Sequence, residues 1–113
     1  MNEPTDREHV LESQLAAANS RIAELTRHDP IYRAAIRHYG EVGQMRKALE
    51  ELAELSVALH HWLDGKGADD DVLGEIADVE VMCGQLRIVF GSDKVDAAKR
   101  MKLDRLVRRM GGE

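Results

Sequence analysis

The sequence predicts an all-α fold, a small helical bundle completed by oligomerisation. Apolar residues recur three and four positions apart in successive segments, which is the period of one helix face. The chain has 113 residues, 43% of them hydrophobic, but only two prolines and four aromatic residues. Leucine, valine, isoleucine, methionine and alanine must therefore build the core. Because a domain of this size buries a limited part of its surface, association of several copies is an easy way to enlarge that core.

The N-terminal segment predicts a coiled-coil-like helix over residues 7–27. Its apolar positions alternate spacings of four and three, the pattern of a coiled-coil seam: Leu11, Leu15, Ala18, Ile22 and Leu25. The seam is short, so it can dock either on the rest of the domain or on a partner chain. We therefore expect an N-terminal helical extension at residues 1–28 and a main helical domain at 29–113.

Turn and capping residues divide the main domain into four expected helices. Asp29 is a suitable N-cap for a first helix from Pro30 to Tyr39, which should end at Gly40. The other three are expected at residues 42–63, 72–90 and 94–110, separated by the polar stretches 64–71 and 91–93 and ended by 111–112. Asp70 or Asp71 is expected to cap the helix that begins at 72. The expected inner stripes are Met45, Leu49, Leu52, Ser56, Leu59 and Leu63 on one helix and Val72, Ile76, Val79, Cys83, Leu86 and Phe90 on the next.

Charge and composition exclude several classes of function. The net charge of −5 argues against general nucleic-acid binding, and a single cysteine, Cys83, excludes an intrachain disulfide. No apolar run approaches the roughly 20 residues of a membrane span. The first eight residues lack the order of a signal peptide, so a cytoplasmic protein without a membrane partner is expected. Acids dominate residues 41–80 and bases dominate 94–109, which suits a metal ion held with a polyphosphate, although a solvated basic helix would look the same.

Two acidic clusters are the most informative residues for function. Glu51 and Glu54 lie about 60° apart on one helix, and Glu75 and Asp78 have the same offset on the next. Both pairs flank an apolar stripe, whereas a merely solvated charged face would lie opposite the core. Antiparallel packing across the loop at 64–71 would bring the pairs together. Four carboxylates near a core need a compensating cation, and an oxygen-only ligand set favours Mg²⁺, with Mn²⁺ as a substitute.

Two other interpretations of these acids are weaker. Ordinary exposed acids on surface helices would give the same Glu-x-x-Glu spacing, but two matched pairs joined by a hairpin are harder to explain in this way. A di-iron carboxylate bundle normally uses Glu-x-x-His pairs, and neither cluster has histidine at the required place.

The acidic pattern, with its flanking residues, resembles the MazG-like all-α NTP pyrophosphohydrolase superfamily, in particular its small single-domain members from phage and bacterial genomes. The resemblance covers about residues 38–108 and leaves the N-terminal helix as an addition. The residues that carry it are Tyr39-Gly40, Gln44, Ala48-Leu49-Glu50-Glu51-Leu52-Ala53-Glu54-Leu55, Glu75-Ile76-Ala77-Asp78-Val79-Glu80, Gln85-Leu86 and Lys102-Leu103-Asp104-Arg105-Leu106.

The resemblance implies an enzyme, a nucleoside triphosphate pyrophosphohydrolase that releases the monophosphate and pyrophosphate from an NTP or dNTP. It implies that Glu51, Glu54, Glu75 and Asp78 bind Mg²⁺. Glu50 would then support the site, and a carboxylate not fully used in coordination would take the proton of the attacking water. The candidates for catalysis are Glu50, Glu51 and Glu54. The family typically forms its sites between subunits, so a homodimer or homotetramer is expected.

Several other residues are candidates for substrate binding. Gln44 and Gln85 lie about 20° from Glu51 and Asp78 on their helices, and Lys47 points toward the acids. Trp62 is about 12 Å along the axis from Glu54, within reach for stacking on a base. Lys99 and Lys102 share a face of the last helix, and the resemblance favours Lys102 as a phosphate contact. Each of these residues can equally be ordinary surface or packing, and the adjacent His60 and His61 make a poor metal pair because they face different ways.

Two non-enzymatic functions remain open from the sequence. The chain can be a regulatory module that binds nucleotide and metal without turnover, with the N-terminal helix engaging a partner. It can also be a purely structural helical oligomer. Metal should raise the melting temperature of the enzyme and of the regulatory module only, and pyrophosphate release should distinguish the enzyme from both.

Overall fold

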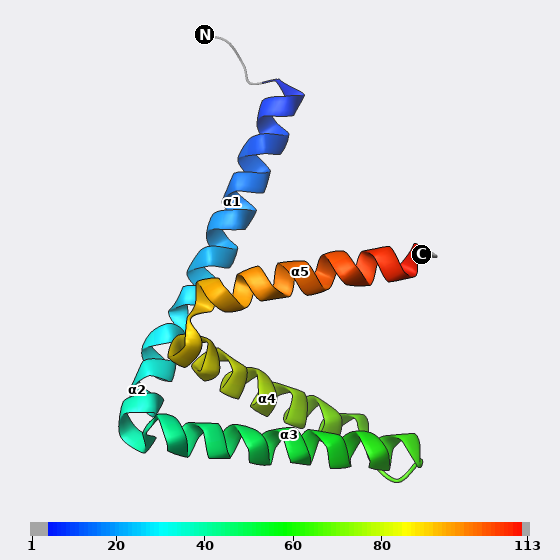
Figure 1. Cartoon of the computed structure of the whole chain (residues 1–113). Coiled ribbons are helices and arrows are strands. Elements are labelled where there is room, and N and C mark those ends of the chain that lie inside the picture. The colour runs from blue at the N-terminus through cyan, green and yellow to red at the C-terminus, as the bar shows by residue number, and fades with distance from the viewer. Residues whose placement is uncertain (1–4, 112–113) are drawn as a thin grey trace. The chain divides into compact units, whose positions relative to one another are not determined.

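The structure describes residues 5–111 apart from the side chains of 23–27, and this range is helical except for short turns and the loop at residues 64–68. In this range the computed structural model has five helices: α1 (Asp6–Arg27), α2 (Asp29–Tyr39), α3 (Glu41–Leu63), α4 (Asp69–Phe90) and α5 (Ser92–Met110) (Figure 1). No strand occurs in residues 5–111, so the predicted all-α class is confirmed. The chain divides into two compact units, Met1–Ile31 and Tyr32–Glu113.

Helix α1 begins with a capping box that fixes its first turn. Thr5 Oγ1 accepts a hydrogen bond from the Glu8 amide at 3.2 Å, and the Glu8 carboxylate accepts one from the Thr5 amide at 3.3 Å. This reciprocal pair satisfies two amides that no helical carbonyl can reach. The apolar positions of the predicted seam are exposed in this chain, among them Leu11 and Leu15. Leu25, the last position of that seam, lies outside the described side chains.

Helices α4 and α5 begin earlier than the sequence predicts. α4 begins at Asp69 instead of residue 72, and its N-cap is Ala68, so the prediction of Asp70 or Asp71 as the cap was wrong. Instead, the Asp71 carboxylate accepts a hydrogen bond from the Ala68 amide at 3.3 Å. Three consecutive aspartates stabilise this first turn because they face the positive end of the helix dipole. α5 begins at Ser92, since Gly91 alone, at φ 104°, turns the chain between the two helices.

Helices α3 and α4 form an antiparallel hairpin that carries the acidic clusters, and they lie side by side in Figure 1. Helix α5 follows α4 and packs against α4 but not against α3. Arg87 and Asp96 form an ion pair at 2.7 Å that fastens the end of α4 to the start of α5. Each described helix is too short or too polar to cross a membrane.

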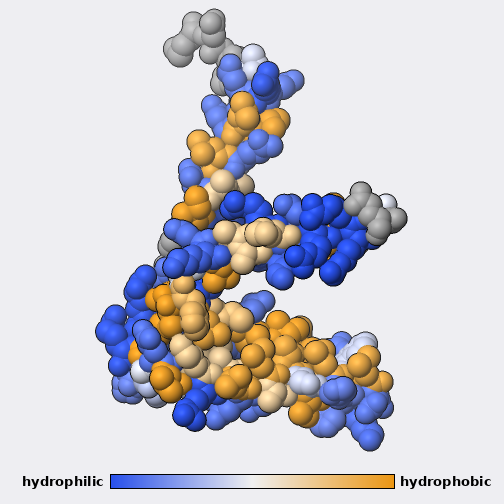
Figure 2. All heavy atoms as spheres, viewed as in Figure 1, coloured by the Kyte–Doolittle hydropathy of each residue, from blue (hydrophilic) through white to orange (hydrophobic). Residues whose placement is uncertain are grey.

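The predicted inner stripe of α3 was wrong for the isolated chain. Leu49 is 68% exposed and Leu63 is 73% exposed, and Leu52 and Leu59 are also exposed. The face of α3 that meets α4 carries Gln44, Ala48 and Glu51 instead. The predicted inner stripe of α4 was correct in part. Val72, Val79 and Leu86 are half-buried, whereas Ile76, Cys83 and Phe90 are exposed. Figure 2 shows the resulting hydrophobic surface over α3 and α4.

The leucines of α3 are exposed because a pair of helices has a single contact seam, and polar and small residues occupy that seam here. Among the described residues, the only buried apolar side chains are Ala48 and Met82. The leucines of the predicted stripe lie on one flank of that seam, about 60–140° round α3 from Gln44. They face neither α4 nor α5 in this chain. The sequence pattern identified an apolar surface correctly, but no described helix covers this surface.

Two glycines of α4 provide a test of the contact between α2 and α4. A Cβ at Gly84 would overlap the ring of Tyr32, whereas a Cβ at Gly74 would meet nothing within 4 Å. Alanine at either position gains about 1 kcal/mol of helix propensity, but at Gly84 the overlap costs about 1–3 kcal/mol. We expect Gly84→Ala to be less stable than Gly74→Ala by roughly that overlap cost, measured by urea unfolding. Equal stability of the two variants would mean that Tyr32 moves freely away from α4.

Candidate metal centre

Three glutamates from the two helices of the hairpin meet at one point. One carboxylate oxygen from each of Glu51, Glu54 and Glu75 lies within 4.8 Å of the others. Glu51 and Glu54 come from successive turns of α3, and Glu75 comes from the antiparallel helix α4. The prediction that the hairpin brings acids of both clusters together is therefore confirmed for these three residues.

Burial makes this carboxylate group unusual. Glu51 is only 6% exposed, and Glu75 is half-buried. Glu51 Oε2 and Glu75 Oε2 are buried and have no hydrogen-bond partner among the described residues. Burying an ionised carboxylate without a partner is costly unless a cation compensates it. The donor set is oxygen only, which is the set that Mg²⁺ and Mn²⁺ prefer, so these residues fit a hard divalent cation.

Lys47 supplies part of the missing positive charge from within α3. Its Nζ lies 3.1 Å from Glu51 Oε1 and 3.6 Å from Glu50 Oε2. The hydrogen bond to Glu51, followed by the charges of Glu51 and Glu50, raises the pKa of Lys47 above its ordinary value. Lys47 therefore stays protonated and pairs with the outer oxygen of Glu51. It leaves Oε2 of the same carboxylate without a partner.

The electrostatic conflict is visible at Glu54, the exposed member of the group. The charge of Glu51, and then that of Glu75, raises the pKa of Glu54 above its ordinary value of 4.5. Like charges held this close disfavour simultaneous ionisation. A bound cation would reverse this effect, because it favours the charged form of every carboxylate that faces it.

This shift predicts how pH affects the metal-free protein. Because the pKa of Glu54 is higher in the folded state than in the unfolded state, folding takes up protons. Protonation of Glu54 therefore stabilises the folded protein at pH values below its unfolded-state pKa. This stabilisation disappears as the pH rises through its folded-state pKa. Glutamine has no such charge. We expect Glu54→Gln to be more stable than the wild type at neutral pH in the presence of a chelator, and the difference to vanish on acidification to about pH 4. Thermal unfolding of the two proteins across this pH range measures the difference in stability. A difference that does not change with pH would contradict the raised pKa of Glu54.

The fourth predicted ligand does not join this group in the isolated chain. Asp78 lies one turn beyond Glu75 on α4, but its side chain is exposed and lies outside the cluster. Glu50 is also exposed and contacts Lys47. The roles of both residues stay predictions.

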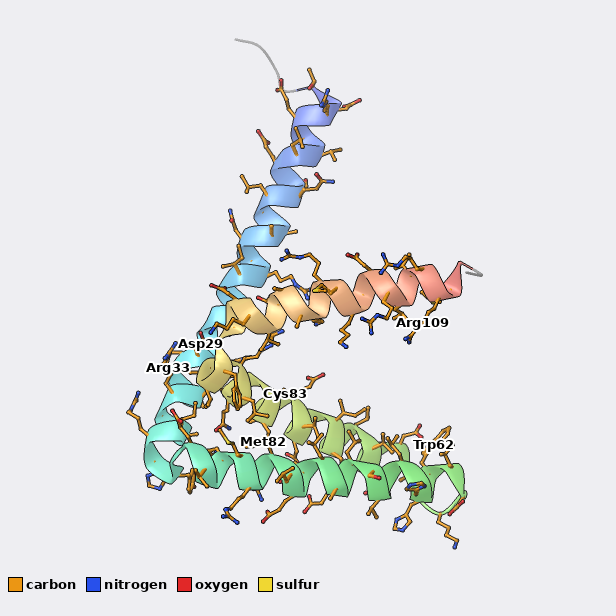
Figure 3. All side chains as sticks on the ribbon, viewed as in Figure 1. Asp29, Arg33, Trp62, Met82, Cys83 and Arg109 are labelled. Carbon is orange, nitrogen blue, oxygen red and sulfur yellow. The ribbon has the colours of Figure 1, made fainter. Side chains whose placement is uncertain are left out.

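The predicted substrate-binding glutamines pair with each other. Gln44 Nε2 donates a hydrogen bond to Gln85 Oε1 at 2.6 Å, and Gln85 Nε2 contacts Met82 Sδ at 3.7 Å. Both glutamines are buried, and Met82 lies between the two helices in Figure 3. This bridge joins the start of α3 to the last part of α4. The pair thus has a structural role, and nucleotide contact by either residue stays a prediction.

The remaining candidates lie away from the three glutamates. Trp62 lies at the loop end of the hairpin (Figure 3), where its indole N–H donates a hydrogen bond to Asp69 at 2.7 Å. Lys99 and Lys102 are exposed on α5. No described contact brings any of these three side chains to the carboxylates, and their substrate contacts stay predictions.

A pocket next to the glutamates includes residues that the sequence analysis missed. Glu54 and Glu75 form part of its wall, and His61, Lys66 and Asp71 also line it. His61 lies seven residues after Glu54, which places the two about 20° apart on α3. That spacing was readable in the sequence. Lys66 and Asp71 carry no such signal, because the fold of the loop decides their position.

Function has to be inferred from this geometry. No family model, no curated protein and no solved structure matches the chain. What the molecule presents is an all-α chain with a carboxylate group suited to a hard divalent cation.

Proposed function

We propose that this chain is a Mg²⁺-dependent nucleoside triphosphate pyrophosphohydrolase of the MazG-like type, acting as a homo-oligomer. The observation that carries the proposal is the group of Glu51, Glu54 and Glu75, in which two buried oxygens have no hydrogen-bond partner in the described part of the chain. Its members come from the two motif segments that resemble the family. A structural pair of helices has no need for three carboxylates at its seam.

The chemistry follows from the charge of the site. Glu51, Glu54 and Glu75 would hold a divalent cation, which would neutralise charge on the phosphate oxygens and lower the pKa of bound water. In this proposal Glu54, the most exposed of the three, accepts a proton from the attacking water. Water attacks the α-phosphorus, the bond from that phosphorus to the bridging oxygen breaks, and pyrophosphate leaves with that oxygen. Asp78 is a fourth ligand in this proposal, which requires its side chain to turn toward the group.

Oligomerisation is part of the proposal because the apolar flank of the hairpin needs a cover. Leu49, Leu52, Leu59 and Leu63 form a continuous exposed stripe along α3. Fully burying each such leucine contributes about 1.5–3 kcal/mol, and the single chain gains only part of this because all four remain 43–73% exposed. A second copy that presents the same flank would form a four-helix bundle.

Pyrophosphate release from a panel of ribo- and deoxyribonucleoside triphosphates, with and without Mg²⁺, tests the function. We expect Mg²⁺-dependent formation of pyrophosphate and the matching monophosphate in equal amounts. Release of orthophosphate instead would contradict cleavage between the α- and β-phosphates. Absence of any product, with Mg²⁺ still raising the melting temperature, would favour the regulatory module.

One observation favours that second candidate. α1 exposes Val10, Leu11 and Leu15, an apolar surface that the three-glutamate site does not use. A partner protein on α1 would suit a nucleotide-sensing module. Turnover in the panel decides between the two candidates.

A further inference from the structure

A pocket of about 420 Å³ opens beside the three glutamates at the loop end of the hairpin. This volume lies within the range of about 300–1000 Å³ that is usual for small-molecule sites. Glu54 and Glu75 belong both to the pocket wall and to the carboxylate group. A ligand in the pocket is therefore in direct contact with the proposed metal site.

The pocket has one apolar side and one polar end. Ala53, Val57 and Ala58 of α3 form the apolar side, and His61, Lys66 and Asp71 supply an imidazole, an ammonium donor and a carboxylate acceptor. A flat heteroaromatic ligand with hydrogen-bonding edges matches this combination, because rings stack on imidazole and alkyl groups while the edges bond to the polar groups.

The backbone holds the polar end in place before any ligand arrives. The Lys66 amide donates to the His61 carbonyl at 2.8 Å, and the Gly65 amide donates to the Trp62 carbonyl at 3.0 Å. With Gly65 at φ 73°, these bonds form a Schellman motif that folds Lys66 back over His61. The hydrogen bond from Trp62 to Asp69 then ties the end of α3 to the start of α4.

The loop also depends on a close approach at Gly67. A Cβ there would lie 3.3 Å from His61 Cβ and 3.4 Å from the Trp62 backbone nitrogen. The chain therefore returns close against the end of α3, and this brings α4 and its Asp71 to the pocket.

The pocket lies on the opposite flank of α3 from the exposed leucines. Counted from Gln44 on the seam, Val57 and His61 lie at about 220–260°, whereas Leu52 and Leu59 lie at about 60–80°. A second copy that covers the leucine stripe leaves the pocket open. A small ligand and a second copy therefore occupy different sides of the hairpin.

We infer that this pocket binds the nucleoside part of the triphosphate, with its base stacked on His61. The inference rests on the proposed function and extends it to the site that selects the base. Terminal phosphates are disfavoured there, because Glu54, Glu75 and Asp71 outnumber the single lysine. The apolar side and the mixed donors and acceptors suit a base and a sugar, and the phosphates then extend from the pocket to the glutamates.

Binding of non-hydrolysable probes tests the inference with a matched pair of histidine variants. His61 lines the pocket, whereas the adjacent and exposed His60 does not. The probes are the α,β-methylene analogues of ATP, GTP, CTP and UTP, together with inorganic triphosphate, all titrated calorimetrically with Mg²⁺. We expect His61→Ala to weaken the best analogue about tenfold or more, since loss of one stacking partner has this effect on nucleotide binding. His60→Ala should bind it as the wild type does.

Inorganic triphosphate distinguishes failure of the pocket from failure of the function. It has no nucleoside, so its affinity should be the same in the wild type and in His61→Ala. Equal analogue binding by His60→Ala and His61→Ala would overturn the pocket assignment and leave the proposed function intact. If the wild type binds none of the probes, both the pocket assignment and the proposed function are overturned.

Discussion

Replacing Glu51 with glutamine is expected to abolish Mg²⁺-dependent pyrophosphate release without unfolding the protein. Glu51 is the most buried member of the carboxylate group, and its Oε2 has no partner among the described residues. Glutamine keeps the shape and removes the charge. We expect a loss of at least about 10²-fold, the loss that removal of one charge-stabilising donor causes in other enzymes.

The same variant should lose the stabilisation by metal. The melting temperature of the wild type should rise with Mg²⁺ by mass action, by the equivalent of about 2.7 kcal/mol at a hundredfold excess over Kd. Glu51→Gln should show little shift. Its metal-free form should be at least as stable as the wild type, because repulsion at Glu54 is relieved.

A glutamate outside the group provides the control. Glu80 is exposed on α4 and takes no part in the cluster, so Glu80→Gln should keep both the shift and the activity. Normal turnover in Glu51→Gln would refute the assignment of Glu51 to the metal.

Placing glutamates on the leucine stripe is expected to separate the oligomer into monomers and lower its stability. The double variant Leu52→Glu, Leu59→Glu puts two charges on a flank where both leucines are now exposed in the single chain. A charge buried in an apolar interface without a partner costs several kcal/mol. Sedimentation velocity should show a dimer or tetramer for the wild type and a monomer for the variant, and the melting temperature of the wild type should rise with protein concentration.

An exposed leucine on another face provides the matched control. Leu73 of α4 is 61% exposed and lies about 120° from Gln85, 160° from Glu75 and 180° from Met82 on its helix wheel. Leu73→Glu carries the same chemical change, and we expect it to leave assembly unchanged. A wild type that is monomeric at micromolar concentration would contradict the assignment of the leucine stripe to a second copy.

The carboxylate site was predictable from the sequence to a large extent. The spacing of Glu51, Glu54 and Glu75 on two helices joined by a short loop indicated their meeting, because three or four residues make one helical turn. Sequence spacing could not predict how deeply each side chain is buried. Glu51 is buried and Asp78 is exposed, although the wheel treats the two pairs as equivalent.

The glutamine bridge and the pocket depended on the tertiary structure. Gln44 and Gln85 are 41 positions apart, and their hydrogen bond follows only from the register in which α3 packs against α4. The pocket arises because Gly65 turns the chain and Gly67 lets it return close to His61. The sequence indicated only that the adjacent His60 and His61 make a poor metal pair, because the neighbours of His61 across the loop are set by the fold.

The sequence by itself determined that this protein is all-α, where most of its helices end, and which acids share a face. These properties are local, because helical period, capping residues and glycines act within a few positions along the chain. Only the tertiary structure decided which face of each helix meets the other. The sequence pattern placed Leu52 in the inner stripe of α3 and Glu51 beside that stripe, yet packing buries the glutamate and leaves the leucine exposed. That choice depends on how two helices fit against each other, which no single-helix pattern contains.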